Sequence, residues 1–184
     1  MKNFWLLLIF SLVVTGVNLP IARAQSDDNA PFYFGVDLSY VNELDDCGAV
    51  YRVNGEAQDA FTLFADQGAT LVRARLWHNP DWTNYSTLDD VKRTFTRARE
   101  AGMSTLLDFH YSDNWADPGS QEIPAAWEDI ADDTDALAEA LYQYTYETLN
   151  ALYAEDLTPA FVQVGNETNS GMLSIGGDLN WARQ

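Results

Sequence analysis

The chain has 184 residues, enough for one ordinary domain, and a formal net charge of −18 at pH 7. Its 28 acidic residues outnumber 10 basic ones, which argues against nucleic acid as a partner, because phosphate contacts need clustered Lys and Arg. The same balance disfavours binding to anionic membrane surfaces. Cys47 is the single cysteine and the two histidines are isolated, so we expect no internal disulfide, no metal site and no cofactor.

Residues 1–24 have the pattern of a secretory signal peptide. Lys2 supplies a positive start, residues 4–14 form an apolar run, and an A-R-A cleavage site ends at Ala24. The apolar run is too short to span a bilayer as a helix. We therefore expect a secreted protein, extracellular or periplasmic, cleaved near Ala24, with an uncleaved N-terminal anchor as the alternative. Residues 25–31 are polar and predict a disordered lead-in.

The first predicted strand covers 32–38 and is followed by a polar connection over 39–55. A helix is expected over 56–67, because apolar residues recur on one face and Gly68 provides a C-terminal stop. The apolar run at 70–77 then predicts a second strand.

A second helix is expected from Thr87, where T-x-x-D resembles a capping box, to Gly102. A third strand at 104–109 leads into a loop over 110–131, and ordered loops of that length are usually functional. The remaining expected elements are a helix over 134–153, a strand over 160–164 and a loop over 168–184.

Strands alternate with helices along the whole of 32–184. Such alternation predicts parallel strands joined by right-handed crossovers. The expected fold class is α/β, a (β/α)8 TIM barrel of which this chain supplies about the first half, four strands.

In such barrels the catalytic groups lie on the loops after the carboxyl ends of the strands. Glu167 follows the apolar run at 160–164, and the amide of Asn166 before it can bind a substrate hydroxyl. A glutamate in that place suits the general acid of glycoside hydrolysis, which needs a second carboxylate across the scissile bond. A structural role is the alternative for Glu167, and N-x-T at Asn166 also matches a glycosylation acceptor.

Charged residues are expected on the inner face of the barrel. Arg73 and Arg75 share one face of their strand, and an inward arginine must be paired. Arg75 lies nearer the carboxyl end, where substrate or a carboxylate could meet it, and a structural ion pair is the alternative for both. Asp108 is a plausible partner for an arginine. His110 lies at the tip of its strand, as a site residue or as a satisfied hydrogen-bonder.

The long loop carries two tryptophans and two aspartates. The flat rings of Trp115 and Trp127 suit stacking on sugar rings, with anchoring of the loop as the alternative. Asp113 and Asp117 are either site residues, solvated charges or turn formers.

Five segments resemble glycoside hydrolase family 53, the arabinogalactan endo-β-1,4-galactanases: GVDLS at 35–39, RARLWHNP at 73–80, AGMSTLLDFHYSDNWADPGSQ at 101–121, PAAW at 124–127 and VQVGNETNSGML at 162–173. The resemblance implies a (β/α)8 barrel and retaining hydrolysis of β-1,4-galactan, the neutral side chain of pectin. It implies that Glu167 is the acid/base and that Asn166 binds the sugar at the scissile bond. It further implies a site lined by Asp37, Arg75, His110, Trp115 and Asp117.

In that family the nucleophile is a second glutamate in the other half of the barrel, and no residue here matches it. We therefore expect this chain to be an N-terminal fragment that is inactive and poorly folded alone. The expected partner is a polysaccharide, with no nucleic acid and no membrane, and the oligomeric state is left open. The alternatives are a related barrel glycanase acting on another polymer and a non-catalytic carbohydrate-binding protein.

Overall fold

The computed structural model describes residues 31–174. The predicted signal peptide, 1–24, lies outside the described residues, as do most of the predicted lead-in and the segment 175–184. The described helices and strands all belong to a unit that begins at Tyr33.

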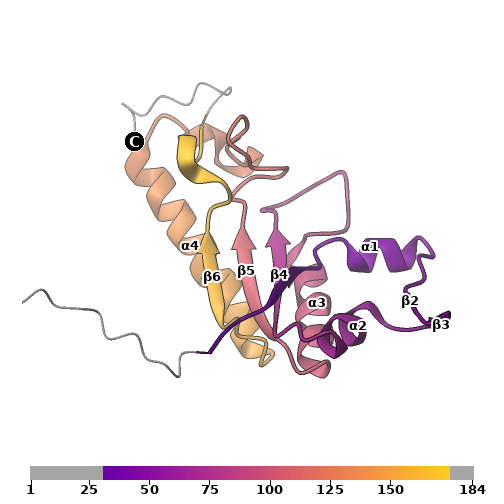
Figure 1. The fold of residues 1–184 in the computed structure, drawn as a ribbon. Helices are drawn as coiled ribbons and strands as arrows, with labels where there is room; N and C mark the ends of the chain where they lie inside the picture. The colour runs from indigo at the N-terminus through magenta and orange to yellow at the C-terminus, as the bar shows by residue number, and fades with distance from the viewer. Residues whose placement is uncertain (1–30, 175–184) are drawn as a thin grey trace, which may run out of the picture. The chain divides into compact units, whose positions relative to one another are not determined.

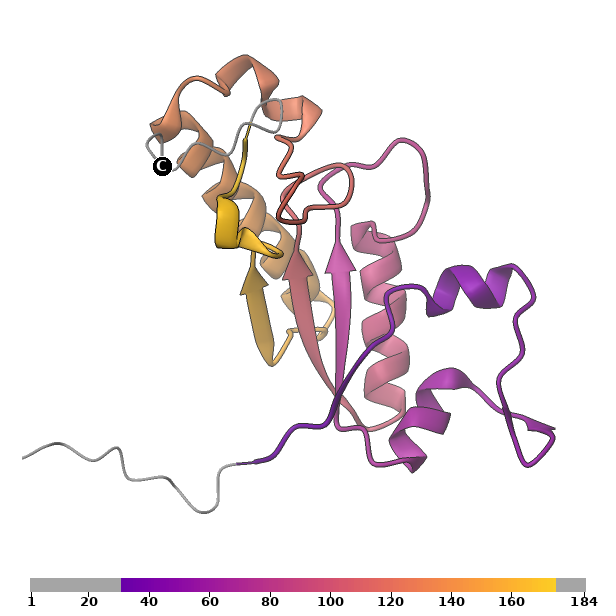
Figure 2. The same cartoon turned by 45° about the horizontal axis from the view of Figure 1, so that its top comes forward.

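Four parallel strands form the central sheet (Figure 1). They are β1 (Gly35–Asp37), β4 (Leu71–Leu76), β5 (Ser104–Phe109) and β6 (Phe161–Val164). Their order in the sheet, β1-β4-β5-β6, follows their order in the chain, as successive right-handed crossovers require. All four carboxyl ends therefore lie along one edge, and Figure 2 shows the loops after β4, β5 and β6 above it.

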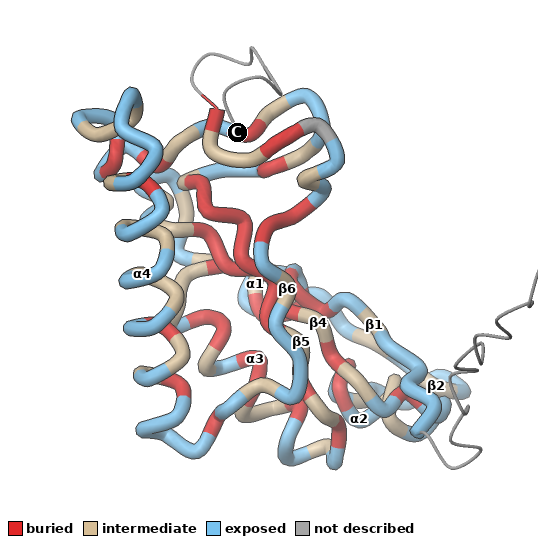
Figure 3. The backbone as a smooth tube through the Cα atoms, turned by 90° about the vertical axis from the view of Figure 1, so that its left-hand side faces the viewer, coloured by how far each residue is buried: buried red, intermediate tan, exposed pale blue. Residues whose placement is uncertain are grey.

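Helices cover one face of the sheet (Figure 3). α2 (Ala60–Asp66), α3 (Leu88–Glu100) and α4 (Thr134–Ala154) are the crossover helices. Alternate strand residues point at them, so Leu107 and Phe109 of β5 are fully buried. Burial of each such side chain contributes roughly 1.5–3 kcal/mol to the stability of the fold. The hydrophobic core therefore lies between this outer face of the sheet and the helices.

The opposite, inner face carries the charged residues, as the strand alternation predicted. Arg73 is paired with Asp108 across β4 and β5, and its side chain is partly exposed. The sheet also curls. The rings of Tyr33, just before β1, and Phe161, on β6, meet edge to face at 4.9 Å, although these strands are the two outer members of the sheet. Such curvature is typical of a barrel wall.

The segment predicted as a plain connection, 39–55, is the largest difference from the sequence analysis. It contains α1 (Val41–Asp46), and β2 (Arg52–Val53) pairs antiparallel with β3 (Glu56–Ala57). The turn between β2 and β3 is Asn54-Gly55, both with positive φ, which is the N-G signal of a tight hairpin.

The start of the first crossover helix was consequently predicted four residues too early. Ala57, expected on that helix, lies in β3. α2 begins at Ala60 because the side chain of Asp59 caps it, accepting a hydrogen bond from the Thr62 amide at 3.0 Å.

Other boundaries agree with the sequence analysis. β5 has the predicted bounds, and Thr87 caps α3 by accepting from the Asp90 amide at 3.3 Å. The long loop after β5 contains one short 3₁₀ helix, Ala125–Ile130, and α4 follows it. Among the described helices, none is long and apolar enough to cross a membrane.

Candidate active site

Glu167 lies at the carboxyl end of β6, and the local backbone presents its side chain to solvent. Gly165 has φ +87°, and a Cβ there would stand 2.5 Å from Thr168 Cγ2. Glu167 itself is left-handed, with φ 48° and ψ 43°, and begins the short 3₁₀ helix Thr168–Ser170. A non-glycine residue in this conformation is uncommon and clusters at functional sites. The turn therefore lifts an exposed carboxyl group off the end of a strand.

The neighbouring Asn166 is buried and its amide is held from both ends. Its Oδ1 accepts from Arg73 Nη2 at 2.9 Å and from Gln163 Nε2 at 3.2 Å, while its Nδ2 donates to the Ala116 carbonyl at 2.7 Å. Two donors at one end identify that end as the oxygen. The Nδ2 group keeps a second N–H that can donate to a ligand beside Glu167.

Arg73 connects all four strands of the sheet. From β4 it pairs with Asp37 on β1 and Asp108 on β5, and its Nε donates to Gln163 Oε1 on β6 at 3.3 Å. Including its bond to Asn166, this guanidinium donates hydrogen bonds to four side chains through its rigid, planar set of N–H groups. The structural ion pair that was the alternative for Arg73 is confirmed.

Asp37, predicted to line the site, is tied to its own loop as well as to Arg73. Partial burial raises the pKa of Asp37. Hydrogen bonds from the Ser39 hydroxyl at 2.6 Å and the Ser39 amide at 3.0 Å, together with Arg73, lower this pKa by a larger amount. The net pKa lies below the ordinary value, so Asp37 is ionised at neutral pH.

His110 and Asp108 share one face of the strand end, as predicted, and both are buried. His110 Nε2 lies 3.2 Å from Asp108 Oδ2, and its Nδ1 accepts from the Ala116 amide at 3.0 Å. Because Nδ1 accepts, a neutral His110 carries its proton on Nε2, the nitrogen that lies near the carboxylate. Asp108 Oδ1 is buried without a hydrogen-bond partner among residues 31–174. The arrangement fits the satisfied hydrogen-bonder that was the alternative for His110, and it fixes the loop at Ala116.

Arg75 is buried at its strand end, and its role as a residue that lines the site stays a prediction. It is 4 % exposed, and no carboxylate forms an ion pair with it among the described residues, so the ion-pair alternative is wrong there. Instead its Nε and Nη2 donate to Ser86 Oγ at 3.0 and 2.9 Å, and three aromatic rings surround it. Burial lowers the pKa of Arg75, and Tyr40 and the carboxylates of Asp37 and Asp108 offset part of that shift.

The two loop tryptophans differ in burial, and the sugar-binding role of Trp115 stays a prediction. Trp115 is 41 % exposed, and its ring packs against the guanidinium of Arg75. Trp127 is buried, with its ring 4.8 Å from that of His78, so it anchors the loop.

Both loop aspartates accept hydrogen bonds from backbone amides. Asp117 Oδ1 accepts from the Gly119 amide at 2.7 Å, in a tight turn that closes on Ser120. Asp113 accepts from the amides of Asn79 and Ala125 at 2.8 and 2.9 Å and so joins the loops after β4 and β5. Asp117 is thus the turn former that was one of its alternatives.

The sequence analysis did not single out four residues that build this edge. Tyr40 and Trp77 contact Arg75, and Ser86 accepts its hydrogen bonds. The ring of Trp82 packs against that of Trp77 at a tilt of 48°. Aromatic residues just after a strand end were the available signal for Tyr40 and Trp77.

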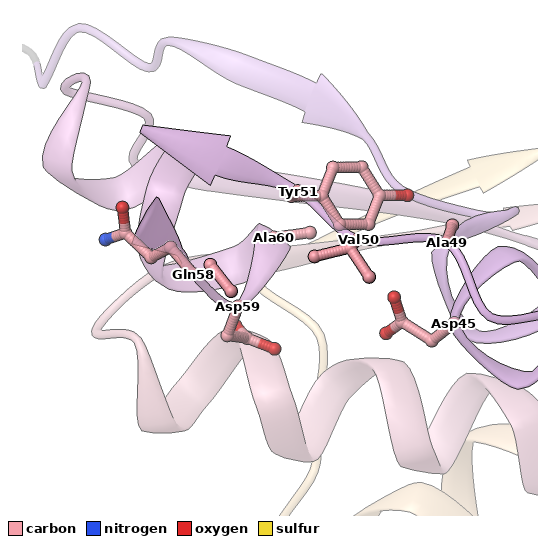
Figure 4. A pocket seen from close by; sticks show the side chains of 8 residues that line it. Asp45, Ala49, Val50, Tyr51, Gln58, Asp59 and Ala60 are labelled. Atoms are coloured by element: carbon pink, nitrogen blue, oxygen red, sulfur yellow. The ribbon is translucent and has the colours of Figure 1, made fainter. Parts of the chain in front are cut away.

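A separate hollow of about 270 Å³ lies away from the strand ends (Figure 4). Its walls come from α1, the β2–β3 hairpin and the start of α2. Two of its carboxylates, Asp45 and Asp59, pair with Arg97. The hollow therefore belongs to the packing of the first loop. Within residues 31–174 no group of three His, Cys, Asp or Glu side chains is arranged to hold a metal ion.

A curled parallel sheet with crossover helices outside, polar residues inside and a glutamate at a strand end is the architecture of the barrel glycosidases. Residues 33–184 match glycosyl hydrolase family 53. The chain belongs to this family.

Its relatives agree with the assignment. The chain is 56 % identical over 168 residues to an arabinogalactan endo-β-1,4-galactanase of Cellvibrio japonicus, covering 89 % of this chain and 44 % of the relative. A solved fungal β-1,4-galactanase superposes with a TM-score of 0.76 at 40 % identity, covering 84 % of this chain and 46 % of that one. The family 53 catalytic domain of Ignisphaera aggregans gives 0.74 at 32 % identity, with 85 % and 46 % covered. The chain spans about half the length of these relatives.

Proposed function

We propose that the whole protein is an endo-β-1,4-galactanase that cleaves the galactan chains of pectic arabinogalactan, with Glu167 as its acid/base. The observation that carries this is the exposed Glu167 beside a fixed Asn166 at a strand end, in a chain 56 % identical to a galactanase. Glu167 protonates the leaving oxygen, and the free N–H of Asn166 donates to the sugar at the scissile bond.

We place the nucleophile on a part of the protein outside this sequence. Retaining hydrolysis needs a second carboxylate about 5–5.5 Å from the first. The described carboxylates on the inner strands, Asp37 and Asp108, are both engaged by Arg73. An ion-paired carboxylate is a weaker nucleophile than a free one, so neither is assigned this role. By the same proposal, residues 1–184 alone are inactive.

Secretion is part of the proposal and rests on residues 1–24. A polymeric substrate cannot enter a cell, so the enzyme must meet it outside the cytoplasm. N-terminal sequencing of the protein recovered from the culture medium or periplasm is expected to begin at Gln25. A mature protein that still begins at Met1 contradicts it.

The test of the activity uses the full-length gene product on linear β-1,4-galactan. We expect oligosaccharide products whose newly formed ends keep the β configuration by NMR. Glu167→Gln is expected to lower kcat by at least about 10²-fold, the typical contribution of a general acid. Glu147→Gln, at an exposed position of α4, is the control. Gln163→Glu on β6 is unsuitable, because Gln163 donates a hydrogen bond to Asn166 Oδ1.

The alternatives give different results in the same assay. Faster cleavage of mannan, xylan or glucan than of galactan indicates a related glycanase with another substrate. Galactan binding without cleavage, unchanged in Glu167→Gln, indicates a carbohydrate-binding protein and contradicts the proposal.

A further inference from the structure

Three aromatic rings from three loops surround the buried guanidinium of Arg75. Its Cζ lies 4.6 Å from the ring centre of Tyr40, 4.4 Å from that of Trp77 and 4.2 Å from that of Trp115. Ser86 Oγ accepts from both Nε and Nη2 and so fixes the guanidinium plane. Cation–π attraction strengthens when the cation is desolvated, as Arg75 is. The positions of the rings are therefore set by one buried charge.

Trp82 adds a fourth ring to this group. Its ring centre lies 4.8 Å from that of Trp77, and its Nε1–H donates to the Asp113 carbonyl at 3.2 Å. The indole is thus anchored by a tilted contact with the Trp77 ring and by its only polar atom, yet it is 56 % exposed. An anchored ring with its polar atom satisfied inside the protein presents an apolar face to solvent, and such a face favours a partner.

Trp77 is buried, whereas the other three rings are open to solvent. Tyr40 is 46 % exposed and Trp115 is 41 % exposed, in addition to Trp82. We refer to Tyr40, Trp82 and Trp115 as the aromatic platform. Its members follow β1, β4 and β5, and Glu167 follows β6, so all four residues lie along the same edge of the sheet.

We propose that the aromatic platform binds successive galactose units of the substrate chain on the β1–β4 side of Glu167. This inference rests on the proposed function and adds the residues that hold the polymer. The ring faces suit the apolar faces of pyranoses, and binding would remove both surfaces from water. The chain's net charge of −18 disfavours a uronate polymer and agrees with a neutral one. Arg75 acts through the rings, as a positioning residue.

Another group of exposed aromatics provides the matched control. Tyr142 and Tyr146 stack on each other on α4, with Tyr146 53 % exposed. They resemble Tyr40 in residue type and exposure, but they lie on a helix that covers the outer face of the sheet. Replacing Tyr146 removes a similar ring without touching the strand ends.

The experiment measures binding of linear β-1,4-galactan and β-1,4-galactohexaose to the full-length gene product carrying Glu167→Gln, by calorimetry and by affinity electrophoresis. We expect Trp82→Ala and Tyr40→Ala each to raise Kd roughly tenfold, the effect of losing one buried ring face. Trp82→Phe keeps a flat ring and is expected to restore most of the affinity. Tyr146→Ala is expected to leave Kd unchanged.

The outcomes separate this inference from the proposed function. If the wild type cleaves galactan and Glu167→Gln does not, while Trp82→Ala and Tyr40→Ala bind as tightly as Tyr146→Ala, the platform role is overturned and the function stands. Equal binding with a lowered melting temperature also overturns it, because the rings then serve packing. A full-length protein that neither binds nor cleaves galactan overturns both.

Discussion

Gly165 is the single residue on which the position of Glu167 most depends. The strand must turn within two residues so that Asn166 stays buried while Glu167 is exposed. A Cβ there would lie 2.5 Å from Thr168 Cγ2 and 3.0 Å from Met172 Sδ, so these side chains would have to shift to admit it. The positive φ of +87° disfavours any side chain in addition.

We therefore expect Gly165→Ala to destabilise the full-length protein by about 2–4 kcal/mol, the sum of a strained φ and an overpacked contact. Because the turn must shift, kcat on galactan falls as well. Gly48→Ala is the control: Gly48 has a similar φ of +86°, but nothing lies within 4 Å of its Cβ position. Its cost is expected to be about 1 kcal/mol, with kcat unchanged. Denaturant unfolding and galactan kinetics measure both variants, and equal losses would show that the contact with Thr168 has no effect.

At the scale of elements, α3 illustrates how local sequence signals determine a boundary. Thr87 Oγ1 accepts from the Asp90 amide and donates to the Asn84 carbonyl at 3.2 Å. Thr87→Ala leaves the first-turn amide without this acceptor and is expected to cost about 1 kcal/mol of stability.

Thr96 on the same helix provides the control, because it donates only to the carbonyl of Lys92 four residues earlier, at 2.8 Å. Thr96→Ala is expected to be neutral within about 0.5 kcal/mol, since alanine has the higher helix propensity. Thermal unfolding compares the two, and a larger loss at Thr96 would contradict the capping argument.

The elements that could be predicted from the sequence are those whose pattern is local. The period of apolar residues located β4, β5 and α4, and strand alternation placed Arg73 and Asp108 on one face. The β2–β3 hairpin was missed although Asn54-Gly55 is a hairpin signal, because each strand has only two residues and no apolar period. Short elements held by a turn leave little hydrophobic pattern to read.

The sequence allowed us to predict candidate residues of the site better than the contacts that these residues make. Glu167, Asn166 and Trp115 are recognisable because each follows a strand of clear pattern. The environment of Arg75 was not, since its partners Tyr40 and Ser86 are separated from it in sequence and meet it only through the fold. Strand alternation shows that a charge points inward, but the choice between a carboxylate and aromatic rings depends on which loops fold back over it.

At the scale of the whole molecule, the ion pairs and hydrogen bonds of Arg73 on the inner face of the sheet help to hold β1 against the other strands. β1 has only three residues and pairs with β4 alone among the described strands. The ion pair between Asp37 on β1 and Arg73 on β4 adds a side-chain connection to that short ladder. Arg73 then continues to β5 and β6, so protonation of one carboxylate affects the attachment of the first strand to the other three.

This network predicts the sign of a pH effect on stability. Interactions with Ser39 and Arg73 hold the pKa of Asp37 below its ordinary value of 3.8 in the folded state. A depressed folded-state pKa adds stability that is present above about pH 4 and is lost as the pH falls through the folded pKa. The contribution is at most about 1 kcal/mol, because the Asp37 side chain is 44 % exposed.

Asp37→Asn tests this directly in the full-length protein. The variant is expected to be less stable than the wild type at pH 6, and the difference should shrink as the pH falls through the depressed pKa of Asp37 in the folded state, where Asp37 becomes protonated. Asp156→Asn removes the partner of Arg99 from a fully solvated pair and should give a small difference at every pH. Urea unfolding from pH 2.5 to 6 measures both. A gap for Asp37→Asn that widens on acidification would mean that the charge of Asp37 opposes folding, and that Arg73 holds β1 in place without it.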